Sequence, residues 1–210
     1  MLKFLKYLLK TTLFWLLTFA FYRLIFILFN LSYVLAKSFW VGLRLDISMT
    51  GYILLLVSFL QAVKILFVRK FTYQLLHWVN YIFIVVFTAL LLANINLYSY
   101  WGRLLDAEGF SFLKTPWVIF ASVSWYESML FLIIWLGLSG LAIYLYKLLT
   151  RKIICIKNFS PLATGIASFL VLLIAALLII PIRGGFGVAP NNTGVAYFSS
   201  YNYANHAAVN

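Results

Sequence analysis

The hydrophobic positions of this chain form five long continuous runs separated by shorter polar segments. The runs cover residues 11–36, 50–68, 75–98, 126–146 and 161–182. A helix needs about 20 residues to cross a hydrocarbon core roughly 30 Å thick, and each run approaches or exceeds that length with few charges. The strands of a membrane barrel would instead alternate apolar and polar positions. The pattern therefore predicts five transmembrane helices.

The class of fold follows from the same pattern. Peptide groups inside a bilayer find no water, so a continuous apolar run satisfies them by forming a helix. We expect an all-α integral membrane domain over residues 1–182, built as a bundle of five transmembrane helices. After residue 182 the sequence becomes rich in Gly, Asn and Tyr. Residues 183–210 are therefore predicted to be a linker outside the membrane.

Composition and charge agree with a multi-pass protein of the cell membrane. The chain has 210 residues, of which 65% are hydrophobic, and this is more apolar surface than a soluble core of this length can bury. Its formal net charge of +12 would suggest nucleic acid in a soluble protein. Here the basic residues flank the apolar runs, so we expect the phospholipid bilayer as partner and no nucleic acid.

The distribution of Lys and Arg predicts the orientation. If the N-terminus is cytoplasmic, the outer side holds five of these residues, and the inner side holds ten: Lys3, Lys6, Lys10, Lys64, Arg69, Lys70, Lys147, Arg151, Lys152 and Lys157. Short cytoplasmic loops carry an excess of Lys and Arg. We therefore expect the N-terminus in the cytoplasm and the C-terminus outside the cell.

Residues for hydrolytic or metal chemistry are scarce in this sequence. There are two histidines, at positions 77 and 206, one cysteine at 155, and no cluster of carboxylates with the spacing of metal ligands. We therefore predict no catalytic residue, no metal site and no cofactor within this chain.

Arg23 is a charge near the middle of the first predicted span. An arginine at a helix centre costs about 2.5 to 3.5 kcal/mol on insertion scales, which the surrounding Leu, Ile and Phe offset. Intramembrane charges commonly face a bundle interior or a polar cavity. Two interpretations stay open, a functional polar path and a structural role through pairing or snorkelling.

Arg44 and Asp46 stand just before the second predicted span, at head-group depth on the outer side. A guanidinium group suits phosphate oxygens in bidentate geometry. The alternative is a local ion pair that settles the loop. Trp101, Arg103 and Glu127 share the same outer side, as either part of a head-group pocket or an ordinary wet interface.

Three segments resemble the membrane portion of the lipoteichoic acid synthase family. The first is Gly-Leu-Arg-Leu-Asp-Ile-Ser-Met at 42–49, and the second is the outer loop at 96–116 with Tyr-Trp-Gly at 100–102. The third begins with Pro-Ile-Arg-Gly-Gly at 181–185 and runs to Asn-His-Ala-Ala-Val-Asn at 205–210. The resemblance covers essentially the whole chain, and that family shares the five-span plan with the C-terminus outside.

The resemblance implies an enzymatic function that requires a further domain in addition to this chain. Members of the family are sulfatase-fold phosphoglycerol or phosphoethanolamine transferases of the bacterial cytoplasmic membrane. Their transfer chemistry lies in a following sulfatase-like domain with a Thr nucleophile and a divalent metal, Mn, Mg or Zn. We expect this chain to anchor that missing domain and to present the lipid head group. The head-group candidates are Arg44, Asp46, Trp101, Arg103, Glu127 and Arg183.

A different class of function stays open, a stand-alone membrane scaffold or small transporter in which Arg23 lines a polar path. One buried arginine without a buried acidic partner makes a poor coupling pathway, so the sequence counts against transport. Transport by the 210-residue chain, lost on substitution of Arg23, would distinguish this alternative.

Overall fold

The computed structural model describes residues 2–29, 36–67, 70–102, 104–111, 114, 117, 124–151 and 161–185. In this part of the chain every extended regular element is a helix. The helices are α1 (Leu2–Phe29), α2 (Ala36–Phe67), α3 (Lys70–Trp101), α4 (Ala107–Ser111), α6 (Trp125–Thr150), α7 (Pro161–Leu177) and α8 (Ile179–Arg183).

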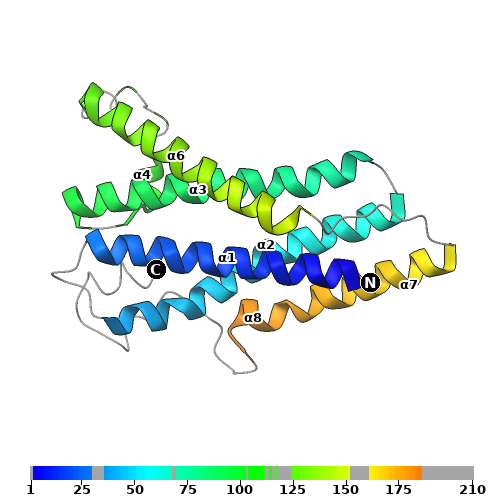
Figure 1. The fold of residues 1–210 in the computed structure, drawn as a ribbon. Helices are drawn as coiled ribbons and strands as arrows, with labels where there is room; N and C mark the ends of the chain where they lie inside the picture. The colour runs from blue at the N-terminus through cyan, green and yellow to red at the C-terminus, as the bar shows by residue number, and fades with distance from the viewer. Residues whose placement is uncertain are drawn as a thin grey trace.

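Five segments are long and apolar enough to cross a membrane, and α7 and α8 together supply the fifth. This confirms the prediction of an all-α protein with five candidate spans. The long helices lie side by side, and α6 diverges from the others towards its beginning (Figure 1). Helix α2 packs against α1, α3, α7 and α8, which gives it the central place in the bundle.

The second helix extends further than its apolar run. It begins at Ala36, whereas the hydrophobic pattern places the start of the span at residue 50. The added turns contain Arg44, Asp46 and Ser48, which are polar. Their side chains bond to neighbouring helices, as described below. The helix can therefore include these polar residues, although they precede the apolar run.

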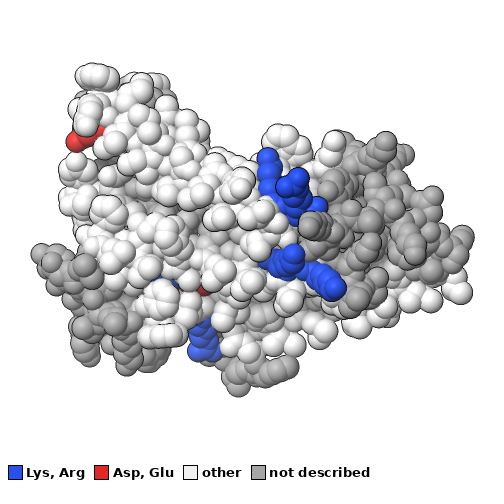
Figure 2. Space-filling view, in the orientation of Figure 1, with Lys and Arg blue, Asp and Glu red and all other residues white. Residues whose placement is uncertain are grey.

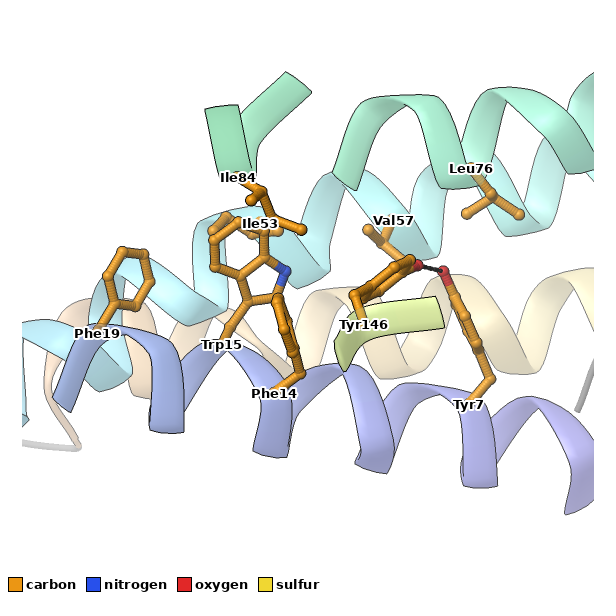
Figure 3. Packing of buried hydrophobic residues seen from close by; sticks show 9 residues of the cluster. All are labelled: Tyr7, Phe14, Trp15, Phe19, Ile53, Val57, Leu76, Ile84 and Tyr146. Atoms are coloured by element: carbon orange, nitrogen blue, oxygen red, sulfur yellow. Dashed lines mark hydrogen bonds between the residues drawn. The ribbon is translucent and has the colours of Figure 1, made fainter. Parts of the chain in front are cut away.

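A cluster of aromatic and aliphatic side chains fills the centre of the bundle (Figure 3). Trp15 of α1 is fully buried and lies 5.4 Å from the Phe14 ring and 5.5 Å from the Phe19 ring, centroid to centroid. Phe14 in turn meets the ring of Tyr146 of α6 edge to face at 5.3 Å. Rings packed in this way add about 0.5 to 1.5 kcal/mol per pair beyond the area they bury.

Polar side chains inside the bundle are joined across helices. The Trp15 indole N–H donates to Asn80 Oδ1 of α3 at 3.0 Å, and the hydroxyls of Tyr22 and Thr88 lie 2.6 Å apart. The hydroxyls of Tyr7 and Tyr146 are 2.9 Å apart, a contact drawn in Figure 3. Between membrane helices such bonds contribute modestly, but each one requires a particular register. They therefore fix how α1 lies against α3 and α6.

A proline explains the interruption between α7 and α8. Pro181 has no N–H to donate to the carbonyl of Leu177, and its ring crowds that carbonyl. The chain turns at Leu178 and continues as α8, which ends at Arg183. Gly184 follows with φ of 90°, and its N–H donates to the Ile180 carbonyl, while the Gly185 N–H also reaches Ile180. This left-handed glycine closes the helix.

Candidate functional site

A buried ion pair joins α1 to the first half of α2. Arg23 Nη2 lies 2.6 Å from Asp46 Oδ1, and Arg23 Nε donates to Asp46 Oδ2 at 3.2 Å. Both side chains are only 8% exposed. Two N–H groups on two carboxylate oxygens form the planar fork that makes Arg the preferred partner of a carboxylate. The arrangement neutralises the charge that the sequence places inside the first span.

Gly42 makes room for this pair. It lies one turn before Asp46 on the same face of α2, and its carbonyl accepts a bond from Arg23 Nη2 at 3.2 Å. A methyl group built on Gly42 would collide with the guanidinium of Arg23. Only a residue without a side chain leaves space for the arginine to reach the backbone.

The structure corrects two interpretations drawn from the sequence. Arg23 does have a buried acidic partner, and that partner is Asp46. The local ion pair between Arg44 and Asp46 is absent from the described residues, because residues two apart on a helix point to different faces. Asp46 is buried against α1 and is therefore not an exposed contact for head groups.

Arg44 and Ser48 hold the end of α8. Arg44 Nη2 donates to the carbonyl of Gly184 at 2.9 Å, and Ser48 Oγ donates to the carbonyl of Ile182 at 2.6 Å. The last carbonyls of a helix lack partners within the helix, so these two bonds satisfy groups that would otherwise need water. The residues after the fifth span are thus tied to the second span.

Close packing supports these bonds. Gly51 of α2 faces Ile182, and a methyl group added to Gly51 would come within 2.7 Å of Ile182 Cγ1. Small residues at helix interfaces let backbones approach closely in membranes. We use the name α1–α2–α8 polar cluster for Arg23, Gly42, Arg44, Asp46, Ser48, Ile182 and Gly184.

The remaining head-group candidates are placed differently. Glu127 forms a capping box at the start of α6, with Glu127 N donating to Ser124 Oγ at 3.3 Å and Ser124 N donating to Glu127 Oε2 at 3.1 Å. Trp101 is the last residue of α3, and Arg183 is exposed at the end of α8. Arg103 and the linker from residue 186 onwards lie outside the described residues.

The side chains of the cluster are suited to hydrogen bonding and ion pairing, and they do not form a catalytic arrangement. Its polar side chains are two guanidinium groups, one carboxylate and one hydroxyl, and it contains no nucleophile paired with a base. Among the described residues no group of three His, Cys, Asp or Glu side chains could hold a metal ion. The divalent metal implied by the family resemblance therefore has no fitting ligand set in the described part of this chain.

The sequence pointed to Arg23, Arg44 and Asp46, but it did not reveal which residues they meet. Gly42 and Ser48 were missed as functional positions. Gly42 could have been found from its spacing of four residues to Asp46, which puts both on one helix face. The carbonyls of Ile182 and Gly184 carry no signal in the sequence.

Comparisons of the chain with protein-family models, with curated proteins and with solved structures found no match.

Proposed function

We propose that this chain is the membrane-anchoring and lipid-presenting domain of a bacterial sulfatase-family transferase. That enzyme moves phosphoglycerol or phosphoethanolamine from a phospholipid to an acceptor in the cell envelope. One observation carries the proposal: two segments that resemble the lipoteichoic acid synthase family, 42–49 and 181–185, are bonded to each other. The bond between Arg44 and Gly184 spans 140 positions of the chain.

This contact supports an anchoring role because of where it lies. The last described stretch of the chain ends just after α8, at residue 185, and Arg44 and Ser48 bond to its backbone at Gly184 and Ile182. The proposed linker would therefore start from a defined position beside α2. Anchoring of this kind restricts the distance between a catalytic domain and the membrane surface.

Lipid presentation is the second part of the proposal. Arg44 and Arg183 are exposed near the same end of the bundle, and guanidinium groups bind phosphate oxygens well. In the proposed enzyme they orient the head group of the donor lipid. The phosphoryl transfer itself belongs to a sulfatase-like domain beyond residue 210, which holds the divalent metal.

The proposed orientation has the N-terminus in the cytoplasm and the C-terminus outside the bacterial cytoplasmic membrane. Cys155 is the only cysteine and stands in a predicted cytoplasmic loop, which makes it a convenient reporter. A membrane-impermeant maleimide should label Cys155 in lysed cells and not in intact spheroplasts. In a variant with Cys155→Ser and Ser124→Cys, the new cysteine should be labelled in intact spheroplasts as well as in lysed cells. Labelling of Cys155 from outside would overturn the orientation.

The function can be tested in two steps. Reading the gene beyond codon 210 should show a sulfatase-like domain, and a stop codon there would contradict the proposal. In the full-length protein, Arg44→Ala and Arg183→Ala should each lower transfer from a fluorescent phospholipid about tenfold, the effect of losing roughly 1.4 kcal/mol of binding. Lys6→Ala, an exposed change on α1, is the control. Unchanged transfer in both arginine variants would remove the lipid-presenting role.

A second candidate, a stand-alone scaffold or small transporter, is favoured by one observation. The buried Asp46 supplies the acidic partner of Arg23 that the sequence reading lacked. Ion or solute flux by the purified 210-residue chain in liposomes, abolished in a folded Arg23→Gln, Asp46→Asn variant, would support it. Absence of flux would leave the anchoring role as the better account.

A further inference from the structure

A groove lies towards the other end of the bundle from the α1–α2–α8 polar cluster. It has a volume of about 580 Å³ and is formed by the first turns of α3 and the last turns of α6. Its walls include Gln74, His77, Trp78 and Tyr81 from α3, and Lys147 and Arg151 from α6. The proposed function gives these residues no role, and only the charges of Lys147 and Arg151 entered the prediction of orientation.

The rear wall of this groove is an aromatic cluster. The His77 ring stacks on Tyr81 with centroids 6.1 Å apart and meets Tyr146 edge to face at 5.8 Å. Tyr146 is fully buried and bonded to the hydroxyl of Tyr7. The wall of the groove on the α3 side is therefore packed against the core of the bundle.

The charges in the groove are positive. Lys147 Nζ lies 5.2 Å from the centroid of the Tyr81 ring, and Arg151 follows one turn later on α6. Figure 2 shows Lys and Arg gathered over the end of the bundle where α1 begins and α6 ends, with an acidic side chain visible at the far end of α6. Lys10 of α1 also lies there and donates to the carbonyl of Leu149 at 3.0 Å.

Among the residues that the structure describes, no carboxylate side chain pairs with Lys147 or Arg151. The chain's four acidic residues are at positions 46, 106, 108 and 127. Asp46 is taken by Arg23, and the other three lie between the end of α3 and the first turn of α6, away from the groove. Lys147 and Arg151 thus have no acidic side chain beside them in the described part of the chain, and this arrangement suits an anionic ligand.

We infer that this groove binds the phosphate-bearing head group of an anionic phospholipid. Basic pockets between transmembrane helices on the cytoplasmic side are suited to such head groups. In the orientation proposed above, the lipid belongs to the cytoplasmic leaflet. The inference does not depend on the transferase proposal, which concerns the other end of the bundle.

The rim of the groove favours a lipid over free phosphate. Trp78 and Tyr144 line it and are each 62% exposed. Trp and Tyr prefer the depth of the head groups, where an apolar ring and a polar atom are both accommodated. Leu148 continues the lining on α6 and is 58% exposed, so acyl chains leaving the groove would meet apolar side chains. Inorganic phosphate would contact the two cations but would gain nothing from the aromatic and apolar side chains of the rim.

The test uses the purified full chain in a neutral detergent, titrated with dioleoyl phosphatidylglycerol and, separately, with dioleoyl phosphatidylcholine. Bound lipid is counted by native mass spectrometry. The variant is Lys147→Gln with Arg151→Gln, which removes both charges and keeps a polar side chain at each position. The matched control is Lys6→Gln with Lys114→Gln, which removes the same charge from exposed positions outside the groove. Circular dichroism and thermal unfolding establish that all three proteins are folded.

We expect the native chain to bind one phosphatidylglycerol in preference to phosphatidylcholine. The groove variant should lose about 10- to 30-fold in affinity, as expected from two cations near a membrane surface, and the control should lose less than threefold. Equal losses in variant and control would reduce the effect to net charge and overturn the site. Displacement of the lipid by millimolar inorganic phosphate would identify a free anion as the ligand and overturn the lipid assignment.

Discussion

The cations at the two ends of this bundle have different partners. In the α1–α2–α8 polar cluster, Arg23 and Arg44 donate to a carboxylate and to backbone carbonyls of neighbouring helices. At the other end, Lys147 and Arg151 line a groove and have no acidic partner among the described residues. The first arrangement holds helices together, and the second leaves charge available for a ligand. Removing a cation should therefore affect stability at one end and binding at the other.

The largest effect should come from breaking the buried ion pair. Arg23→Ala leaves the Asp46 carboxylate buried without its partner, which costs roughly 3 to 5 kcal/mol of unfolding free energy. Equilibrium unfolding in mixtures of dodecyl sulfate and a neutral detergent measures this. The double variant Arg23→Met, Asp46→Leu removes both charges and should recover most of the loss. A loss below about 1 kcal/mol in Arg23→Ala would show that the pair does not join the helices.

Filling the space beside the pair should cost less. Gly42→Ala places a methyl group against the Arg23 guanidinium, and forced repacking of this kind costs about 1 to 3 kcal/mol. Gly137→Ala in α6 is the matched control, because an added methyl there meets nothing within 4 Å. The control should be neutral or stabilising by up to about 1 kcal/mol, since alanine favours a helix. Equal responses of the two glycines would contradict the role given to Gly42.

The tie between α2 and α8 should be weaker still. Ser48→Ala removes the donor to the Ile182 carbonyl and should cost about 1 kcal/mol. The change should also speed tryptic cleavage after Arg183, because the end of α8 is then held by fewer bonds. Ser99→Ala, whose hydroxyl bonds only within the exposed end of α3, serves as the comparison. Unchanged cleavage after Arg183 would show that Ser48 does not hold this segment.

The smallest change in stability is expected in the groove. Lys147→Gln loses the contact with the Tyr81 ring, which is worth about 0.5 to 1 kcal/mol at an exposed site. Arg151→Gln loses a similar amount through the helix dipole of α6. These are the changes that should weaken lipid binding most. A loss above about 3 kcal/mol in either single variant would place the groove cations among the structural residues and erase the contrast between the two ends.

Much of the architecture follows from the sequence because it depends on local composition. Each of the five apolar runs overlaps a segment long and apolar enough to cross a membrane, and the fifth run is divided between α7 and α8. The N-cap of α6 is also local, since Ser124 and Glu127 form a capping box through their spacing of three residues. The interruption at Leu178 is likewise written in the sequence, through Pro181. Orientation in the membrane remains a prediction from the distribution of Lys and Arg.

The tertiary structure decided what each polar residue does. The sequence placed Asp46 near Arg44, but the helix turns Asp46 towards Arg23, which is 23 positions away. It gave Lys147 and Arg151 the role of charges beside a membrane, whereas packing of α3 against α6 puts them in one groove with aromatic rings. Apolar runs specify helices because every span meets the same surroundings, a hydrocarbon that offers the backbone no hydrogen bonds. Polar partners depend on the register and rotation of packed helices, which many residues determine together and no single segment encodes.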